Sequence, residues 1–233
     1  MAVADFDGDG KPDIAASNAG RNTAYELYPM PVRLFYGDAN GDGVMELVEA
    51  FAETKTKLWK PIRTLEVFSE TFPHVRGTIT RNKTFASASL RQIIGPAFGD
   101  MNSLEITDLS SAVFLNKTGR FEMRALPDAS QLSPAFDLCS GDFDGDGAVD
   151  LFLAQNAFGV PERASRYDSG RGLLLRGDGT GNFAAVPASE SGIAVYGEQR
   201  GVVAADFDGD GKTDLTVGQR GAATRLFMNR KTD

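Results

Sequence analysis

The chain has 233 residues, of which 42% are hydrophobic, and it carries a formal net charge of −8. This length and composition suffice for a folded core, whereas the acidic balance gives no support for nucleic-acid binding. No apolar run is long enough to insert into a membrane as a span, and the single cysteine, Cys139, excludes an intrachain disulfide.

The first predicted element is a nine-residue acidic turn, Asp5–Asp13, between two short apolar runs. Its sequence, Asp-Phe-Asp-Gly-Asp-Gly-Lys-Pro-Asp, recurs nearly unchanged at 142–150 and 206–214. A fourth copy, at 38–46, keeps a side-chain oxygen at each matching place. Short β-prone runs bounded by Asp and Gly are typical of strands, so each acidic turn is expected to close a β-hairpin.

The acidic turns predict calcium sites. Positions 1, 3, 5 and 9 offer side-chain oxygens, position 7 offers its backbone carbonyl, and the glycine at position 6 allows the sharp turn that makes the ligands converge. Calcium binds hard oxygen ligands, and carboxylates placed this close together would otherwise repel one another. The predicted ligands are Asp5, Asp7, Asp9, Lys11 and Asp13; Asp38, Asn40, Asp42, Val44 and Glu46; Asp142, Asp144, Asp146, Ala148 and Asp150; and Asp206, Asp208, Asp210, Lys212 and Asp214.

Residues 58–95 change from alternation to helical spacing, with apolar residues at three- and four-residue steps from Ile62 to Phe72. Pro61 is well placed for a first helical turn, and a second short helix is expected over 86–94. The pattern therefore predicts a helical insertion at 58–95.

This insertion is basic in an otherwise acidic chain. Residues 55–91 carry eight Lys or Arg but only two acids, Glu66 and Glu70. The plainer interpretation is a solvated helical cap with its basic residues outward. The sharper one is a docking face for an anionic partner or glycan.

Two further hairpins are expected, one from 112–115 to 121–124 and one from 173–176 to 183–186. Together with an acidic hairpin, each would make a four-stranded antiparallel unit, and the 64 residues between the third and fourth acidic turns fit such a unit. Four-stranded units repeated around an axis are the blades of a β-propeller. The predicted fold is therefore all-β: a partial or small β-propeller of about four repeat units, forming a single domain over 1–233 that contains the helical insertion.

The acidic turns resemble the FG-GAP or VCBS repeats of integrin-alpha-like β-propellers. The segment from 136 to 229 is especially similar to bacterial secreted VCBS-repeat proteins related to those with an ASPIC/UnbV-type tail. The stretches that carry this similarity are Arg166–Leu173, Gly197–Gly201 and Gly221–Leu226. The resemblance implies Ca²⁺ as the cofactor of all four turns. The chain departs from the pattern at its end, where no ASPIC-type tail is seen.

Three other acidic patterns resemble metal sites but have simpler structural interpretations. The Asp38 turn also matches EF-hand spacing, because Glu49 falls at position 12, but Val32–Tyr36 alternates as a strand and an EF-hand needs flanking helices. Asp100–Leu104 is similar to a decayed copy with a leucine at a ligand position, so no metal is expected there. Asp178–Gly181 lacks acids at alternate positions and is expected to be a tight hairpin turn.

Signals for catalysis are weak, because His74 is the only histidine and Cys139 is expected to be a buried, inert thiol. The expected function is therefore binding: a calcium-binding extracytoplasmic scaffold for a protein or glycan. The alternative is a carbohydrate-active enzyme of the polysaccharide-lyase propeller type. An extracellular or periplasmic location is expected, since weak calcium sites fill only where calcium is abundant.

The ends of the chain predict open sheet edges. Met1 leads directly into the first acidic turn, which favours a chain cut at its N-terminus and without a signal peptide. The last hairpin has no evident fourth strand. Because a propeller protects its edge strands by closing the ring, self-association through the open edges is expected.

Overall fold

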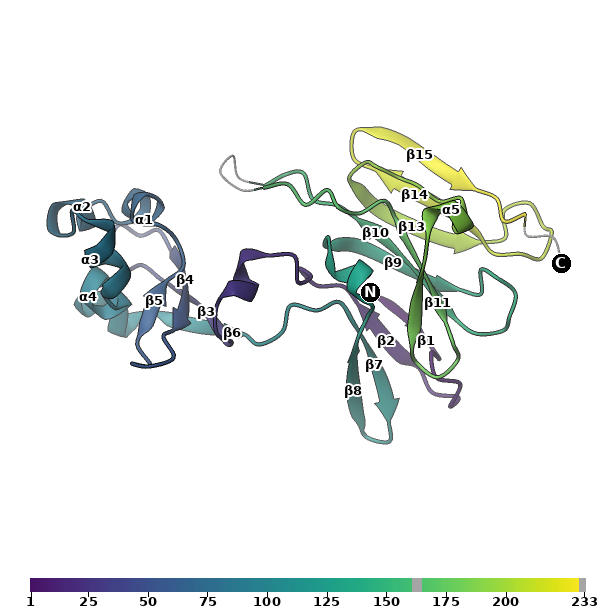
Figure 1. The fold of residues 1–233 in the computed structure, drawn as a ribbon, viewed down its shortest axis with the longest axis horizontal. Coiled ribbons are helices and arrows are strands. Elements are labelled where there is room, and N and C mark those ends of the chain that lie inside the picture. Colours follow the sequence, from purple (N-terminus) through teal and green to yellow (C-terminus); the bar gives the residue numbers. More distant parts are fainter. Residues whose placement is uncertain (161–164, 231–233) are drawn as a thin grey trace. The chain divides into compact units, whose positions relative to one another are not determined.

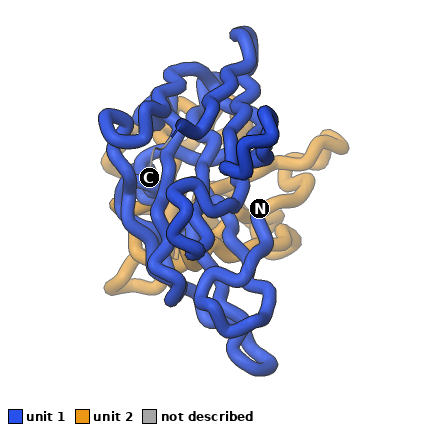
Figure 2. Tube along the Cα trace, turned by 90° about the vertical axis from the view of Figure 1, so that its right-hand side faces the viewer, with its two compact units in different colours: residues 1–23, 109–233 blue, residues 24–108 orange. Residues whose placement is uncertain are grey.

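The structure is a computed structural model that describes residues 1–160 and 165–230 (Figure 1). The chain divides into two compact units: Met1–Thr23 with Leu109–Asp233 form unit 1, and Ala24–Asp108 form unit 2 (Figure 2). Unit 2 is thus inserted into the chain of unit 1. The described residues form four antiparallel sheets and only short helices, and none of these sheets is closed. The predicted all-β class is confirmed.

Unit 1 contains three sheets. Sheet A has the order β1 (Ala2–Ala4), β2 (Asp13–Ala16), β7 (Ala112–Lys117), β8 (Arg120–Ala125). Sheet C has the order β12 (Phe183–Val186), β11 (Leu173–Gly177), β10 (Asp150–Gln155), β9 (Ala135–Gly141). Sheet E has the order β13 (Gln199–Ala205), β14 (Asp214–Gln219), β15 (Ala222–Phe227). The short helices η3 (Asp128–Gln131) and α5 (Ala188–Ser191) lie between strands.

Sheet A explains the irregular spacing of the acidic turns. Strand β2 pairs with β7, with Ile14 opposite Phe114, although the whole of unit 2 separates the two strands in the sequence. The first acidic hairpin is therefore completed by the hairpin expected at 112–124, and not by the segment that follows it directly. Both of the further hairpins predicted from the sequence are confirmed.

Unit 2 has a sheet of its own, with the order β5 (Trp59–Pro61), β4 (Glu46–Ala52), β3 (Val32–Gly37), β6 (Asn102–Ile106). Its helices are η1 (Ala24–Leu27), α1 (Leu65–Thr71), α2 (Val75–Thr78), α3 (Asn82–Ser87), α4 (Leu90–Ile94) and η2 (Pro96–Asp100). The acidic turn here joins the two central strands, whereas in unit 1 each acidic turn joins an edge strand to its neighbour. The helical segment expected at 58–95 thus lies inside a larger unit of residues 24–108.

Helices α1 and α4 begin at residues whose side chains cap them, and no helix begins at Pro61, which ends β5. The hydroxyl of Thr64 accepts the N–H of Val67 and starts α1. Ser89 and Gln92 form a capping box that starts α4. The helix expected over 86–94 is therefore two helices, α3 and α4, because the capping serine requires extended backbone between them.

The basic residues of unit 2 differ in their surroundings. Lys60 is only 5% exposed, and its ammonium donates to the carbonyl of Ser87. Arg76, Arg81 and Lys83 lie on the surface. The expectation that the basic residues point outward is therefore wrong for Lys60 and correct for these three.

Reversing the charge of the three exposed residues is expected to leave unit 2 folded. The free energy of unfolding of the variant Arg76→Glu/Arg81→Glu/Lys83→Glu should lie within about 1 kcal/mol of the parent's, because exposed charges contribute little to stability. Lys60→Glu is the control that should unfold unit 2, since it buries a carboxylate against a carbonyl oxygen. Circular dichroism melts compare the two; equal loss of structure would show that the exposed residues are structural.

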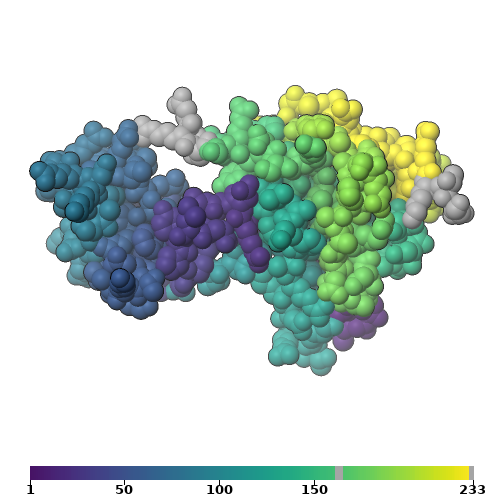
Figure 3. All heavy atoms as spheres, in the orientation of Figure 1, coloured from purple at the N-terminus to yellow at the C-terminus, as the bar shows by residue number. Residues whose placement is uncertain are grey.

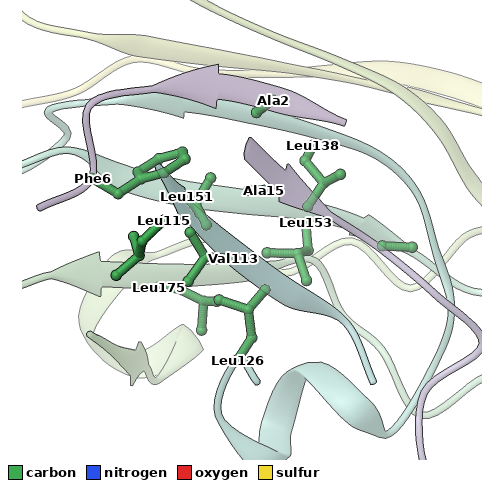
Figure 4. Packing of buried hydrophobic residues seen from close by; sticks show 11 residues of the cluster. Ala2, Phe6, Ala15, Val113, Leu115, Leu126, Leu138, Leu151, Leu153 and Leu175 are labelled. Atoms are coloured by element: carbon green, nitrogen blue, oxygen red, sulfur yellow. The ribbon is translucent and has the colours of Figure 1, made fainter. Parts of the chain in front are cut away.

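The core of unit 1 joins sheets A and C (Figure 4). Buried residues from β7, β10 and β11, including Leu115, Leu151 and Leu175, pack around Phe6, which is 1% exposed. Phe6 occupies position 2 of the first acidic turn. Its ring meets that of Phe183 edge-on at 5.7 Å, and its carbonyl accepts the N–H of Gly181 at 2.9 Å. The position-2 phenylalanine of the acidic turn in sheet A thereby packs against sheet C.

The same packing recurs between sheets C and E. Phe143, at position 2 of the third acidic turn, packs in one cluster with Val202 and Leu215 of sheet E. Its carbonyl accepts the side-chain N–H of Asn229 at 2.7 Å. Phe207, the equivalent in sheet E, is 47% exposed. Among the described residues sheet E has three strands, and self-association along its β15 edge stays a prediction.

Candidate metal centre

Each predicted metal loop is the turn of a hairpin, as expected. The loops join β1 to β2, β3 to β4, β9 to β10 and β13 to β14. Strands flank the Asp38 loop on both sides, which agrees with the rejection of an EF-hand. Asp178 also sits in a hairpin turn, between β11 and β12, as predicted.

Two glycines shape every loop. Positions 4 and 6 both have positive φ, from 71° at Gly8 to 87° at Gly147. This left-handed backbone is open to glycine at little steric cost and folds the loop back on itself. Sequence reasoning gave position 6 this role and missed position 4, although the repeated Gly-Asp-Gly was the available signal.

Three carboxylates converge in every loop, with ligand atoms within 4.8 Å of one another. The groups are Asp5, Asp7 and Asp13; Asp38, Asp42 and Glu46; Asp142, Asp144 and Asp146; and Asp206, Asp208 and Asp210. Every donor is a hard carboxylate oxygen, which is the ligand chemistry that calcium requires. The described residues therefore fit a calcium ion.

The remaining predicted ligands lie outside these groups. They are Asp9, Lys11, Asn40, Val44, Ala148, Asp150, Lys212 and Asp214. Those at position 7 were expected to contribute a backbone carbonyl, and that role stays a prediction.

Backbone N–H groups hold the position-1 carboxylate in place. In every loop it accepts the N–H of the position-6 glycine, from Gly10 to Asp5 at 2.8 Å and from Gly147 to Asp142 at 2.9 Å. The same bond joins Gly211 to Asp206, and it is the largest cause of the lowered pKa of that carboxyl group. The carboxylate is therefore oriented by the turn that it closes.

The position-9 carboxylate in unit 1 does something that the sequence did not reveal. Asp150 is 1% exposed, and its two oxygens accept the N–H of Phe143 and the N–H of Gly177, both at 2.9 Å. It thereby links its own loop to the end of the third strand of the sheet.

The equivalent residues of sheets A and E do the same. Asp13 accepts from Phe6 at 2.8 Å and from Asn116 at 2.7 Å. Asp214 accepts from Phe207 at 2.9 Å and from Asn229 at 2.7 Å. We call this arrangement the carboxylate clip. Position 9 is thus a structural residue whether or not it is also a ligand.

Burial raises the pKa of Asp150, the more so because the carboxylates of Asp144 and Asp146 are near, while the N–H bonds of Gly177 and Phe143 oppose that rise. A nearby cation would favour the charged form of this carboxyl group. A cation held by Asp142, Asp144 and Asp146 would therefore lower the pKa of Asp150.

Basic side chains approach three of the loops, including that of sheet E, where Lys212 Nζ lies 3.9 Å from Asp210. Lys117 forms an ion pair with Asp7, and Lys11 pairs with Asp9 at 3.1 Å. Arg176 Nε lies 2.7 Å from Asp144. Lys117 and Arg176 come from the ends of third strands, β7 and β11, so their proximity depends on strand pairing and was missed from the sequence.

The other singled-out residues have structural surroundings. Asp100 ends the short helix η2. His74 is an exposed residue at the start of α2. Cys139 is only partly buried, in contrast to the expectation, but desolvation still raises the pKa of its thiol to about 12, which supports the expected inert thiol.

Two family matches cover three of the four acidic turns, and the turn at 38–46 lies outside both. The FG-GAP-like repeat matches residues 142–217, and the FG-GAP repeat matches residues 1–28. These matches support an FG-GAP-repeat protein. FG-GAP repeats imply a propeller-like fold, which agrees with the four antiparallel sheets.

One relative is similar over a short stretch. Cartilage acidic protein 1 of Xenopus tropicalis is 35% identical over 66 residues. The stretch covers 28% of this chain and 10% of that protein. In the described part of the chain, no helix has the length and apolar character needed to cross a membrane.

Proposed function

We propose that the chain is a calcium-binding propeller module that serves outside the cytoplasm as a binding or scaffold protein for a protein or glycan partner. The observation that carries the proposal is the convergence of three carboxylates within 4.8 Å in each of four equivalent hairpin turns. FG-GAP repeats are generally found in non-enzymatic binding modules and are typical of extracellular proteins, which supports both the role and the location.

The four loops place their carboxylates at one end of each hairpin, where they repel one another. A bound Ca²⁺ would supply the positive charge that offsets this repulsion. The glycines at positions 4 and 6 hold the turn, and the carboxylate clips of unit 1 fix it to the third strand. In unit 1 the chain's own residues thus fix the loop end of each sheet.

Calcium titration of the full chain tests the proposal. We expect four sites by isothermal titration calorimetry, and Asp142→Asn or Asp206→Asn should each remove one, because the position-1 carboxylate belongs to the converging carboxylates of its loop and the amide lacks its charge. The matched control is Asp178→Asn, in a hairpin turn that lacks acids at alternate positions and holds no predicted site. Unchanged stoichiometry in the position-1 variants, or loss of a site in the control, would contradict the assignment.

A further inference from the structure

Arginine and aromatic side chains gather at the end of sheets C and E that is remote from the metal loops. Strand β10 leaves its metal loop at Asp150 and ends at Gln155, and β14 runs likewise from Asp214 to Gln219. The connections that follow β10 and β14 therefore lie at the other end of the sheets. We call the group formed there by Phe136, Phe158, Arg166, Arg171, Tyr196, Glu198, Arg200 and Arg220 the arginine face.

The buried carboxylate of Glu198 contacts several residues of the arginine face. Its side chain is only 3% exposed, and one of its oxygens accepts the N–H of Phe158 at 2.8 Å, which is the largest cause of its lowered pKa. The same carboxylate pairs with Arg200 and lies 3.5 Å from Arg220 Nη1. A buried acid thus holds the β10–β11 loop, whose described part projects at the surface in Figure 3, and orients two guanidinium groups.

Both arginines remain open to solvent despite this bond. The side chains of Arg200 and Arg220 are 34% and 65% exposed. A guanidinium has five N–H donors, so a single carboxylate leaves several free for a ligand. Because Glu198 already fixes these side chains, little of their conformational entropy would be lost on binding.

Each aromatic ring of the face has a guanidinium over it. Arg200 Cζ lies 3.4 Å from the ring centroid of Phe136, Arg171 Cζ lies 5.3 Å from that of Tyr196, and Arg166 Cζ lies 5.8 Å from that of Phe158. One flat side of each ring is therefore covered and unable to stack on a sugar. Stacked guanidinium groups keep their N–H edges free, and these edges match a carboxylate bidentately.

The charge of the face is opposite to that of the chain. Four arginines stand against one acid, Glu198, among the eight residues that define the face, while the chain carries −8 overall. The face uses Arg and never Lys, together with Tyr and Phe, and this is the composition enriched at the energetic centres of protein interfaces. Charge complementarity points to an acidic partner, and the Arg, Tyr and Phe composition points to a protein in preference to a glycan.

We propose that the arginine face is the docking site for a protein partner, which it binds through carboxylates of an Asp- and Glu-rich segment. The proposal rests on the proposed function as a binding module and specifies its partner.

Binding of a labelled acidic peptide to the calcium-saturated full chain tests the proposal. We expect a fluorescein-tagged (Glu-Gly)₆ peptide to bind by fluorescence anisotropy, more weakly as salt rises. Arg200→Gln/Arg220→Gln should bind about tenfold or more weakly, because charged hydrogen bonds each contribute on the order of a tenfold change in affinity. The matched control is Arg120→Gln/Arg230→Gln, which removes the same charge at the metal-loop end and should leave affinity within about twofold.

A second variant guards against an effect on folding. Arg220→Gln alone removes the more exposed guanidinium and should still weaken binding, with an unchanged melt and calcium stoichiometry. The proposal is overturned by absence of peptide binding to the parent chain, by equal losses in the face and control variants, or by stronger binding of polygalacturonate, which would name a uronate glycan instead. Peptide binding without calcium binding would refute the metal assignment alone; calcium binding without peptide binding would refute only the docking site.

Discussion

Chelation is expected to lower the melting temperature of unit 1 far more than that of unit 2. A ligand at a thousandfold excess over its Kd stabilises the folded state by about 4 kcal/mol per site. Unit 1 holds three of the four loops and unit 2 holds one. The three sites of unit 1 together would contribute about 12 kcal/mol to its free energy of unfolding, which is comparable to the whole stability of an ordinary domain.

Differential scanning calorimetry with calcium and with excess chelator measures this effect. The variant Asp178→Asn serves as control and should respond to the chelator as the parent does, because its hairpin holds no predicted site. Identical melting curves with and without chelator, together with no metal by elemental analysis, would contradict the calcium assignment for every loop.

The second large effect is expected at the carboxylate clip. Asp150→Asn is nearly isosteric, but its amide presents N–H donors where the aspartate accepted from both Phe143 and Gly177. At least one buried backbone N–H is then left without an acceptor, and unit 1 should lose about 3 kcal/mol. This loss should persist in excess chelator, because the bonds involve no metal.

Asp146→Asn is the matched control for the clip. Asp146 is an exposed residue at position 5 of the same loop and belongs to the converging carboxylates. Its substitution should matter with calcium present and have little effect in chelator. Chemical denaturation of both variants in the two conditions separates the roles; if they lose equal stability in chelator, position 9 is no more structural than position 5.

Local features of this fold could be predicted from the sequence. The acidic turns were recognised because each places its glycines and its oxygen ligands within nine residues that are directly flanked by short apolar runs. The hairpin around Asp178 was recognised for the same reason. Where strands pair at short separation, turn chemistry alone specifies the register.

Features that depend on distant pairing could not be predicted. Strand β6 pairs with β3, with Leu104 opposite Leu34, and no local sequence pattern predicts this pairing. Likewise, Asn116 donates to Asp13 from 103 residues away. Asp13 therefore appeared to be only a metal ligand, since the N–H of Asn116 that it accepts belongs to a strand that follows unit 2 in the chain.

The phenylalanine at position 2 couples the sheets of unit 1 in series. Phe6 of sheet A packs against sheet C, and Phe143 of sheet C packs against sheet E. Sheets C and E therefore each contact a phenylalanine ring from the preceding sheet. Stability in such an array resembles a chain of nearest-neighbour terms. A defect at one junction should therefore propagate outward sheet by sheet, and fraying should start at sheet E, where Phe207 lies exposed.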